Sequence, residues 1–479
     1  MGMSLQAPSV KIGLFGIGLD TYWPQFKGLR DKLVGYQQRI RSGLERSGVA
    51  VVDAGLVDNL DKSAAAAALF AGEGVELIFL YISTYALSST VLPVVQKAGV
   101  PVVVLNLQPS SRIDYEAFNK LPSREEKTGE WLAHCQACSV PEIASVFNRA
   151  GIDYHLVTGT LNDPAAQQQM HHWVEAARAA KVLRESRIGL LGHYYAGMLD
   201  VYSDYTQLAG VFGNHFALLE MDELKALRDA ATVQEVSAML AEFGRSFALS
   251  PECSAAELDR AARTSVALHQ LVEKHRLGGM AYYYEGQPGN EHEEIATSVI
   301  AGNTLLTAHH VPVAGEYEVK NALAMKIMDI LGAGGSFSEF YGLDFDDDIV
   351  LLGHDGPAHA AIAEGQVQLV PLEVYHGKPG KGLSVQMSVK NGPVTILSVC
   401  QDRQGQVKLL VAQGHSVPGP VLEIGNTNSR YRFAIGAKAY IETWAKAGPS
   451  HHCAIGVGHV AGSLEKLAQL LDIEYQQVC

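Results

Sequence analysis

Long apolar runs are missing from this sequence, and none approaches the ~20 consecutive apolar residues that a helix needs to cross a bilayer. The first residues, M-G-M-S-L-Q-A-P-S-V-K, also lack the basic segment followed by an apolar one that marks a secretory signal. We therefore expect a soluble, cytoplasmic protein that has no membrane partner.

Cysteine and positive charge are both scarce. Six cysteines in 479 residues do not make the disulfide framework of a small secreted domain, so reduced thiols are expected. Lysine and arginine together number 37 against 51 acidic residues, which gives a formal net charge of −14. Because nucleic-acid binding needs clustered positive charge to neutralise phosphates, we expect no nucleic-acid partner.

Two short motifs that often carry chemistry are incomplete. In G-L-F-G-I-G-L, the dinucleotide spacing G-x-G-x-x-G fails because Thr21 stands where the third glycine belongs, so no nicotinamide cofactor is expected. Cys135 and Cys138 form a C-x-x-C, but neither a second such pair nor a nearby histidine pair completes a zinc site. We interpret them as two inert thiols.

The sequence does contain a repeated strand and helix pattern. Buried-type strands at 10–19, 50–57, 75–82 and 100–107 alternate with helical periodicity, which is typical of a parallel sheet whose strand-end loops bind ligands. The pattern restarts with R-I-G-L-L-G-H-Y-Y, and after Gly335 short strands with turn signals replace it. We predict an α/β protein with two Rossmann-like parallel-sheet domains, 1–181 and 182–332, followed by a mostly antiparallel, barrel-like β domain, 333–479.

Carboxylates and imidazoles occur at the predicted ends of these elements. Glu316 stands where an apolar strand turns into a helix, Glu339 begins an extended segment, His354 closes an apolar run, and His451 and His452 follow a helix and a Gly-Pro-Ser turn. Two glutamates and two histidines suit a divalent ion with oxygen and nitrogen ligands, such as Mn, Mg, Co or Fe. Each residue alone also fits a structural role, as a helix-start acid, a core histidine or a helix-end cation.

The motifs G-E-Y-E-V-K-N-A-L, S-E-F-Y leading to D-D-D-I-V-L-L-G-H, and S-H-H-C-A-I-G-V-G-H occur in an order that resembles the L-arabinose isomerase and L-fucose isomerase superfamily. The resemblance implies a Mn²⁺-type ion, with Mg²⁺ or Co²⁺ as alternatives, held by Glu316, Glu339, His354 and His452. It also implies interconversion of an aldose with its ketose, with Glu316 and Glu339 as the acid/base pair.

The same resemblance implies substrate contacts from other regions, and a closed homo-oligomer, a trimer or hexamer, in which neighbouring subunits share sites. The contacts it implies are Asp20, Tyr22, Tyr85, His134, Met198 and His451. Val319 and Phe340 depart from the superfamily pattern near the pocket, so L-arabinose itself is not the expected sugar. Two alternatives stay open, a non-catalytic sugar-binding or sensory protein and an epimerase that uses the same ion and glutamates.

Overall fold

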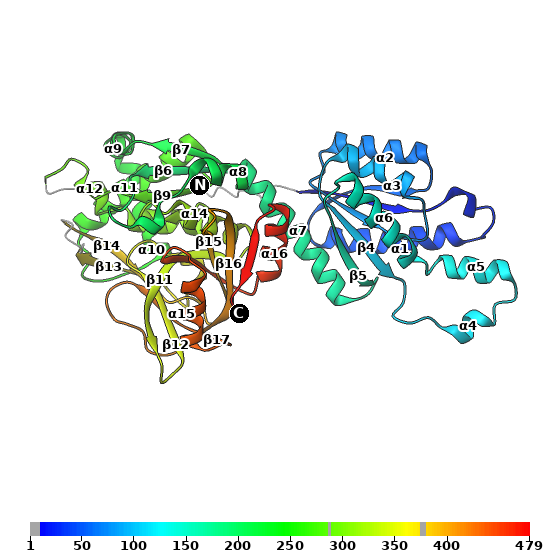
Figure 1. Cartoon of the computed structure of the whole chain (residues 1–479). Coiled ribbons are helices and arrows are strands. Elements are labelled where there is room, and N and C mark those ends of the chain that lie inside the picture. The colour runs from blue at the N-terminus through cyan, green and yellow to red at the C-terminus, as the bar shows by residue number, and fades with distance from the viewer. Residues whose placement is uncertain (1–9, 286–288, 374–379) are drawn as a thin grey trace. The chain divides into compact units, whose positions relative to one another are not determined.

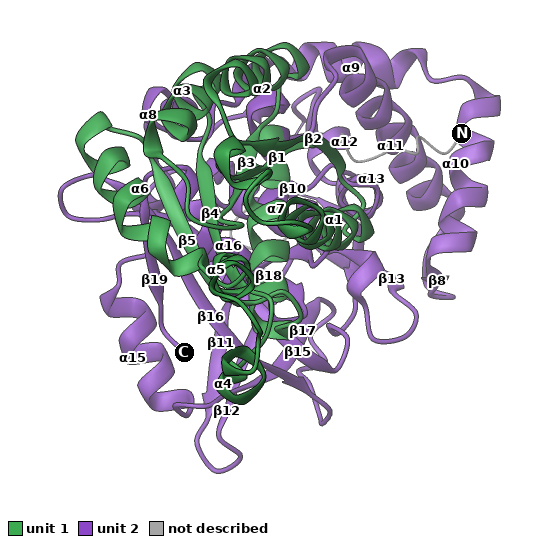
Figure 2. Ribbon diagram, turned by 90° about the vertical axis from the view of Figure 1, so that its right-hand side faces the viewer, with its two compact units in different colours: residues 1–181 green, residues 182–479 purple. Residues whose placement is uncertain are grey.

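The computed structural model describes residues 10–285, 289–373 and 380–479. The chain forms two compact units, Met1–Lys181 and Val182–Cys479 (Figures 1 and 2). The expectation about the N-terminus rests mostly on residues 1–9, which lie outside the described residues. The division into three domains, with a boundary at 332 inside the second unit, stays a prediction.

Unit 1 is built on a five-stranded parallel sheet in the order β2 (Ala50–Val57), β1 (Lys11–Ile17), β3 (Leu77–Tyr81), β4 (Val102–Gln108), β5 (Tyr154–Thr160). Its chain runs outward from β1 to β2 and then back to β3. Right-handed crossovers therefore place α1 (Leu29–Arg46) on the face opposite α2 (Leu60–Glu73), α3 (Ser88–Ala98) and α6 (Gln136–Ala150). The loops after β1 and β3 flank this reversal at the carboxyl edge of the sheet.

The polar, turn-rich sequence of 113–130 predicts turns, but the segment holds α4 (Tyr115–Asn119) and most of α5 (Arg124–Leu132). The reason lies in their first residues. Asp114 and Ser123 are N-caps whose side chains accept hydrogen bonds from the backbone N–H groups of Ala117 and Glu126. Helix α7 (Pro164–Glu185) then leads from unit 1 into unit 2.

Unit 2 begins with a four-stranded parallel sheet in the order β10 (Val313–Ala314), β9 (Gly279–Tyr283), β6 (Arg187–Gly192), β7 (His215–Leu219). The sequence pattern of 222–243 predicts one helix, but the structure has two, α9 (Met221–Ala230) and α10 (Val233–Ser246). Thr232 interrupts it, because its extended backbone and its capping box with Glu235 start a new helix. The remaining elements of this region are η2 (Leu199–Val201), α8 (Tyr205–Phe212), β8 (Ala248–Leu249), α11 (Ala255–His275), α12 (Glu293–Ala296) and α13 (Ile300–Ala308).

Six antiparallel strands close into a barrel in the second half of unit 2. Their order is β15 (Gly392–Gln401), β18 (His452–Val457), β11 (Gly334–Asp344), β12 (Ile349–His354), β17 (Thr427–Phe433), β16 (Val407–Val417), and β16 pairs again with β15. Closure removes the free edges that an open sheet would expose. With the two parallel sheets, the barrel confirms the predicted fold class.

The apolar run P-V-L-E-I-G (420–425) predicts a strand, and this prediction is wrong, because the segment forms no strand and β17 follows it. Pro418 and Pro420 lack the N–H that a sheet ladder needs, which disfavours a strand there. In a third, small sheet, β13 (Gln368–Glu373) pairs with β14 (Lys381–Gln386) on one side and with β8 on the other. The remaining elements are η3 (Ala360–Ile362), α15 (Ala437–Lys446), α16 (Ala461–Leu470) and β19 (Glu474–Gln477).

Helix α14 (Val319–Ile330) joins the parallel sheet of unit 2 to the barrel. Its residues from Val319 to Asp329 are all buried, and it packs against β9 and β10 on one side and against β11, β15 and β18 on the other. A helix that is covered all round is a core element, even though α14 includes Lys320, Lys326 and Asp329. The residues just before α14 are therefore held between the sheet and the barrel.

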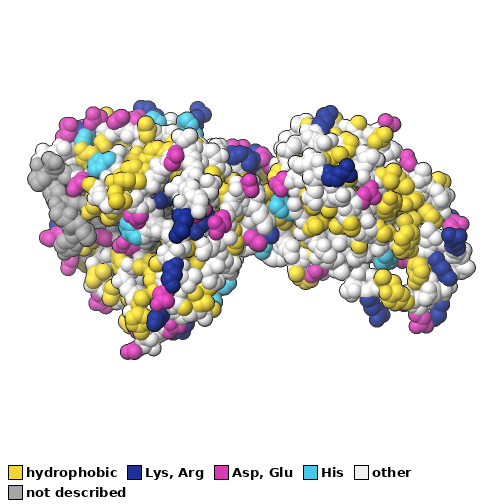
Figure 3. Space-filling model, in the orientation of Figure 1, with side chains coloured by type: hydrophobic (Ala, Val, Ile, Leu, Met, Phe, Trp, Pro, Cys, Tyr) yellow, Lys and Arg dark blue, Asp and Glu magenta, His cyan; other side chains and the backbone are white. Residues whose placement is uncertain are grey.

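Among the described residues, the structure contains no helix long and apolar enough to cross a membrane. On the face shown in Figure 3, lysine and arginine side chains are scattered among carboxylates.

Candidate metal centre and sugar site

A cavity of about 200 Å³ lies where the parallel sheet of unit 2 meets the barrel. Its wall includes Glu316, which follows β10, and His354, the last residue of β12. Glu339 from β11 also lines it, and in the barrel wall Glu339 pairs with Gly353 on one side and His452 on the other. The carboxyl ends of parallel strands are where open α/β sheets bind ligands.

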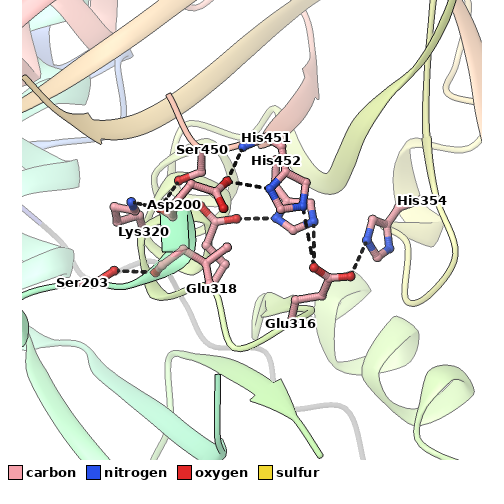
Figure 4. A network of polar contacts seen from close by, with 10 residues as sticks. Asp200, Ser203, Glu316, Glu318, Lys320, His354, Ser450, His451 and His452 are labelled. Atoms are coloured by element: carbon pink, nitrogen blue, oxygen red, sulfur yellow. Dashed lines mark hydrogen bonds and ion pairs between the residues drawn. The ribbon is translucent and has the colours of Figure 1, made fainter. Parts of the chain in front are cut away.

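Glu316 is the point on which three imidazoles converge (Figure 4). Its Oε2 lies 3.4 Å from Nε2 of His452 and 3.7 Å from Nε2 of His451, and its Oε1 lies 3.9 Å from Nε2 of His354. Phe337 closes the apolar side of the group, with its ring centroid 4.5 Å from that of His354 and 4.3 Å from that of His452.

The backbone that presents Glu316 is strained. Glu316 and Tyr317 have φ angles of 55° and 60°, in the left-handed region that non-glycine residues rarely adopt. Such positions cost on the order of 1–3 kcal/mol each and persist where the surrounding structure fixes them. Here the Tyr317 N–H donates to the Tyr282 carbonyl at 3.1 Å and the Glu318 N–H donates to the Gly315 carbonyl at 3.0 Å. Strain of this kind is concentrated at functional sites.

His452 is oriented by a second glutamate. Its Nδ1 lies 2.5 Å from Oε2 of Glu318, and the side chains of both residues are buried, at 0% and 1% exposure. A carboxylate on Nδ1 holds the hydrogen there and leaves Nε2 as a lone-pair donor that faces Glu316. Glu318 therefore fixes both the ring orientation and the tautomer of His452.

His451 is held in the same way by Asp200 of η2. The Asp200 Oδ2 lies 2.6 Å from Nδ1 of His451 and accepts its backbone N–H at 3.0 Å. The Asp200 carbonyl in turn accepts hydrogen bonds from Lys320 Nζ at 2.6 Å and from Ser450 Oγ at 3.1 Å. Helix α14 and the turn before β18 are thus tied to the loop after β6 through this one residue.

The charges of the group influence one another. Burial acts to raise the pKa of Glu316, but His451, His452 and His354 outweigh it and hold that pKa below its ordinary value. Glu316 and Asp200 raise the pKa of His451 to about 9, against the opposing effect of burial. In the metal-free protein, the site therefore holds an ionised Glu316 beside a protonated His451 at neutral pH.

The donor set of this group fits a divalent ion. One ligand atom each from Glu316, His451 and His452 lies within 4.8 Å of the others. Oε2 of Glu316 and Nε2 of His452 are buried and make no hydrogen bond inside the protein, which is what an ion would satisfy. One carboxylate oxygen and imidazole nitrogens suit Mn, Fe, Co or Zn.

The remaining wall of the cavity is rich in tyrosine. Tyr195 follows β6, Tyr283 ends β9, and their rings stack at a centroid distance of 4.8 Å. Tyr284 and Asn303 also line the cavity. Aromatic faces beside hydroxyl and amide groups are able to contact both the C–H and the O–H groups of a polyol.

Four of the predicted substrate contacts, Asp20, Tyr22, Tyr85 and His134, lie in unit 1. Burial raises the pKa of Tyr22, to which Tyr85 adds, so these two phenols lie near each other. Nδ1 of His134 lies 3.0 Å from the Glu130 carbonyl, and Asp20 accepts from Asn59 Nδ2 at 3.4 Å. These contacts belong to unit 1 itself, and their role toward a sugar stays a prediction.

Met198, the fifth predicted contact outside the histidine pair, is the N-cap of η2 and does not line the cavity. Sequence reasoning missed Asp200, two residues later, and Glu318. A carboxylate two residues after Glu316 in G-E-Y-E was a visible signal for Glu318. Asp200 offered no comparable signal, because its partner His451 is 251 residues away along the chain.

Part of this chain matches a known protein family. Residues 354–478 match the L-fucose isomerase C-terminal domain. An L-arabinose isomerase of Nocardioides sp. is 22% identical to this chain over 70% of this chain and 68% of its own length. An L-arabinose isomerase of Yersinia enterocolitica is also 22% identical, over 67% of this chain and 66% of its own length. A sulfoquinovose isomerase of Alkalicoccus urumqiensis is 21% identical over 57% of this chain and 61% of its own length. This chain thus carries an L-fucose isomerase-type C-terminal domain and is a distant relative of the L-arabinose and sulfoquinovose isomerases.

Proposed function

We propose that this protein is a metal-dependent aldose–ketose isomerase that acts on a small monosaccharide, a pentose or hexose. The observation that carries the proposal is the meeting of Glu316, Glu339 and His354 at one cavity, with His451 and His452 beside Glu316. An aldose–ketose exchange needs groups that move a proton between C1 and C2 and between the two oxygens, and two carboxylates meet that need.

The ion we propose is Mn²⁺, with Mg²⁺ or Co²⁺ as alternatives, held by Glu316, Glu339, His354 and His452. His451, whose Nε2 lies 3.7 Å from Oε2 of Glu316, contacts the substrate in this proposal. When bound, the ion would act as a Lewis acid toward neighbouring oxygens of the sugar.

The side chains have separate tasks in this proposal. One of Glu316 and Glu339 removes the proton from the carbon next to the carbonyl, and the other moves a proton between the two sugar oxygens. His451 is protonated in the metal-free protein, faces the same space, and in that state can donate a hydrogen bond to an oxygen on which negative charge develops. Phe337 and the tyrosine wall exclude water and so strengthen these interactions.

The test is proton exchange at carbon in heavy water. The protein is loaded with Mn²⁺, incubated in D₂O with a panel of pentoses and hexoses, and the products are followed by NMR. An isomerase yields a ketose and places deuterium at C2 of its aldose. Products that differ from the substrate only in the configuration of one carbon identify an epimerase, and intact C–H bonds with every sugar refute catalysis.

Glu316→Gln and Glu339→Gln test the assigned roles. Each should reduce turnover by several orders of magnitude, because the amide can neither accept the proton nor serve as an anionic ligand. Thermal unfolding of both variants should remain cooperative. Glu442→Gln, on the exposed face of α15, is the matched control and should turn over at the wild-type rate. Near-normal turnover in either active-site variant would refute the role given to that glutamate.

A further inference from the structure

The C-x-x-C of unit 1 lies at the start of α6. Cys135 is the N-cap of this helix and Cys138 is its third residue. Side chains at these two positions meet across the first turn, as they do in a capping box. The spacing of one helical turn also brings the two Cα atoms into the range of roughly 4.4–6.8 Å that a disulfide spans. The two thiols are therefore neighbours on the first turn of one helix.

The two thiols differ in their access to solvent. Cys138 is exposed, whereas Cys135 is buried with an exposure of 3%. Burial also raises the pKa of the Cys135 thiol to about 12, with a further contribution from Cys138. Because the thiolate is the nucleophile, an external oxidant meets Cys138 first.

The turn that carries the pair is already fixed. The side-chain amide of Gln136 donates to the carbonyls of Ser83 at 3.0 Å and Ala133 at 2.8 Å, and Thr84 Oγ1 donates to the Leu132 carbonyl at 2.8 Å. These bonds link the start of α6 to the loop after β3. A bond between two thiols on the same helical turn requires little movement of this turn.

We propose that Cys135 and Cys138 are a reversible thiol–disulfide site that reacts with a low-molecular-weight disulfide such as oxidised glutathione. Deprotonated Cys138 attacks one sulfur of the oxidant and releases one glutathione thiolate. Cys135 then gives up its proton and attacks the Cys138 sulfur, which releases the second glutathione. The protein loses two electrons and two protons, and one oxidised glutathione becomes two reduced ones.

The site lies beside two side chains of the sheet edge. Tyr22 and Tyr85 follow β1 and β3 at this edge, and both thiols contribute to the raised pKa of Tyr22, after burial and Tyr85. Closing the bridge would therefore stiffen the carboxyl edge of the unit 1 sheet. This inference does not depend on the proposed isomerase activity.

The mass of one tryptic peptide shows whether the disulfide forms, because trypsin releases Cys135 and Cys138 together on residues 128–149. The full-length folded protein is incubated with oxidised glutathione, unfolded in iodoacetamide and digested. The expected product is an unalkylated 128–149 peptide that is lighter than the dithiol form by two hydrogen atoms, and dithiothreitol should restore double alkylation. Double alkylation after oxidation, or a glutathione adduct that persists on Cys138 in the wild type, would overturn the proposal.

Two variants test the order of attack. Cys135→Ser should accumulate the glutathione adduct on Cys138, because the second thiol is missing. Cys138→Ser should stay unmodified, because the remaining thiol is buried. Equal reaction of both variants would refute the assigned order. Cys400 and Cys453, buried in the barrel, serve as internal controls that should alkylate fully only after unfolding.

Discussion

At the scale of single residues, Glu318 is a positioning residue for the proposed ion. We predict that Glu318→Gln weakens Mn²⁺ binding by roughly 10–100-fold, because a carboxylate on the outer nitrogen of a ligand histidine sets both its tautomer and its basicity. An amide can present its N–H as well as its oxygen to Nδ1 of His452, so the ring is no longer held in one state. Isothermal titration calorimetry of the metal-free protein measures this directly.

The matched control for Glu318→Gln is Glu235→Gln. Glu235 caps α10 through Thr232, lies outside the cavity wall, and its loss should leave Mn²⁺ affinity unchanged. Equal Mn²⁺ affinity in Glu318→Gln and the wild type would show that His452 is oriented without its carboxylate partner.

The titration of His269 makes the free energy of unfolding depend on pH. Burial, with a contribution from His309, lowers its pKa from 6.5 to about 4 in the folded protein, and its Nε2 has no hydrogen-bond partner. Between these two values the unfolded chain binds the proton more strongly, so the free energy of unfolding falls as the pH drops from 6.5 toward 4. At pH 5 the loss from this residue is about 2 kcal/mol.

His269→Gln removes that titration. Urea unfolding at pH 7 and pH 5 should show a fall in stability that is smaller in the variant by about 2 kcal/mol. Parallel falls in both proteins would mean that His269 is protonated equally in the folded and unfolded states.

The residues of the site were predictable to different degrees. The sequence pattern marked five residues as candidates that could converge, because they stand at the predicted ends of strands or helices. They are Glu316, Glu339, His354, His451 and His452. The pairs Glu318–His452 and Asp200–His451 join residues 134 and 251 positions apart, and neither a spacing nor a periodicity encodes such contacts.

At the scale of elements, the barrel touches α14 through a glycine. A Cβ added at Gly456 of β18 would come within 2.4 Å of Met328 Cε and 2.9 Å of Ala333 Cβ. Gly456→Ala should therefore lower the free energy of unfolding by roughly 1–3 kcal/mol, because this part of the core is already filled. Denaturant unfolding measures the change.

Gly342→Ala in β11 is the control for this effect. A Cβ there meets nothing within 4 Å, so the same chemical change adds no overlap. Its unfolding midpoint should stay close to or slightly above that of the wild type, because alanine lowers the entropy of the unfolded chain. A matching loss in both variants would show that crowding against Met328 and Ala333 does not set the cost.

Elements were predictable where apolar periodicity was strong and unbroken. The strands of both parallel sheets and α11 have long apolar or amphipathic patterns that few other structures satisfy. The errors arose where local polar contacts decide the outcome, such as the Asp114 and Ser123 caps and the Thr232 box. At 420–433 the apolar P-V-L-E-I-G resembled a strand more than the polar T-N-S-R-Y-R-F that pairs between β12 and β16.

At the scale of the whole molecule, the proposed tasks are divided between the two units. Every proposed ion ligand lies in Val182–Cys479, whereas Asp20, Tyr22, Tyr85 and His134 lie in Met1–Lys181. In unit 2, the closed barrel and the buried helix α14 form the frame that holds these ligands. The proposed homo-oligomer, a trimer or hexamer, would let unit 1 of one subunit complete the site of another.

Subunit mixing tests this sharing. Tyr85→Ala disables the unit 1 contact and Glu316→Gln disables the ion site, so each variant alone should be inactive. If sites form between subunits, dissociating and reassembling the two together creates some sites with an intact unit 1 and an intact unit 2, about a quarter of them in a random mixture. Activity should then rise well above that of either variant, and light scattering should show one mass for all three samples. If each site belongs to one chain, every site in the mixture keeps a defect and activity stays at the background level.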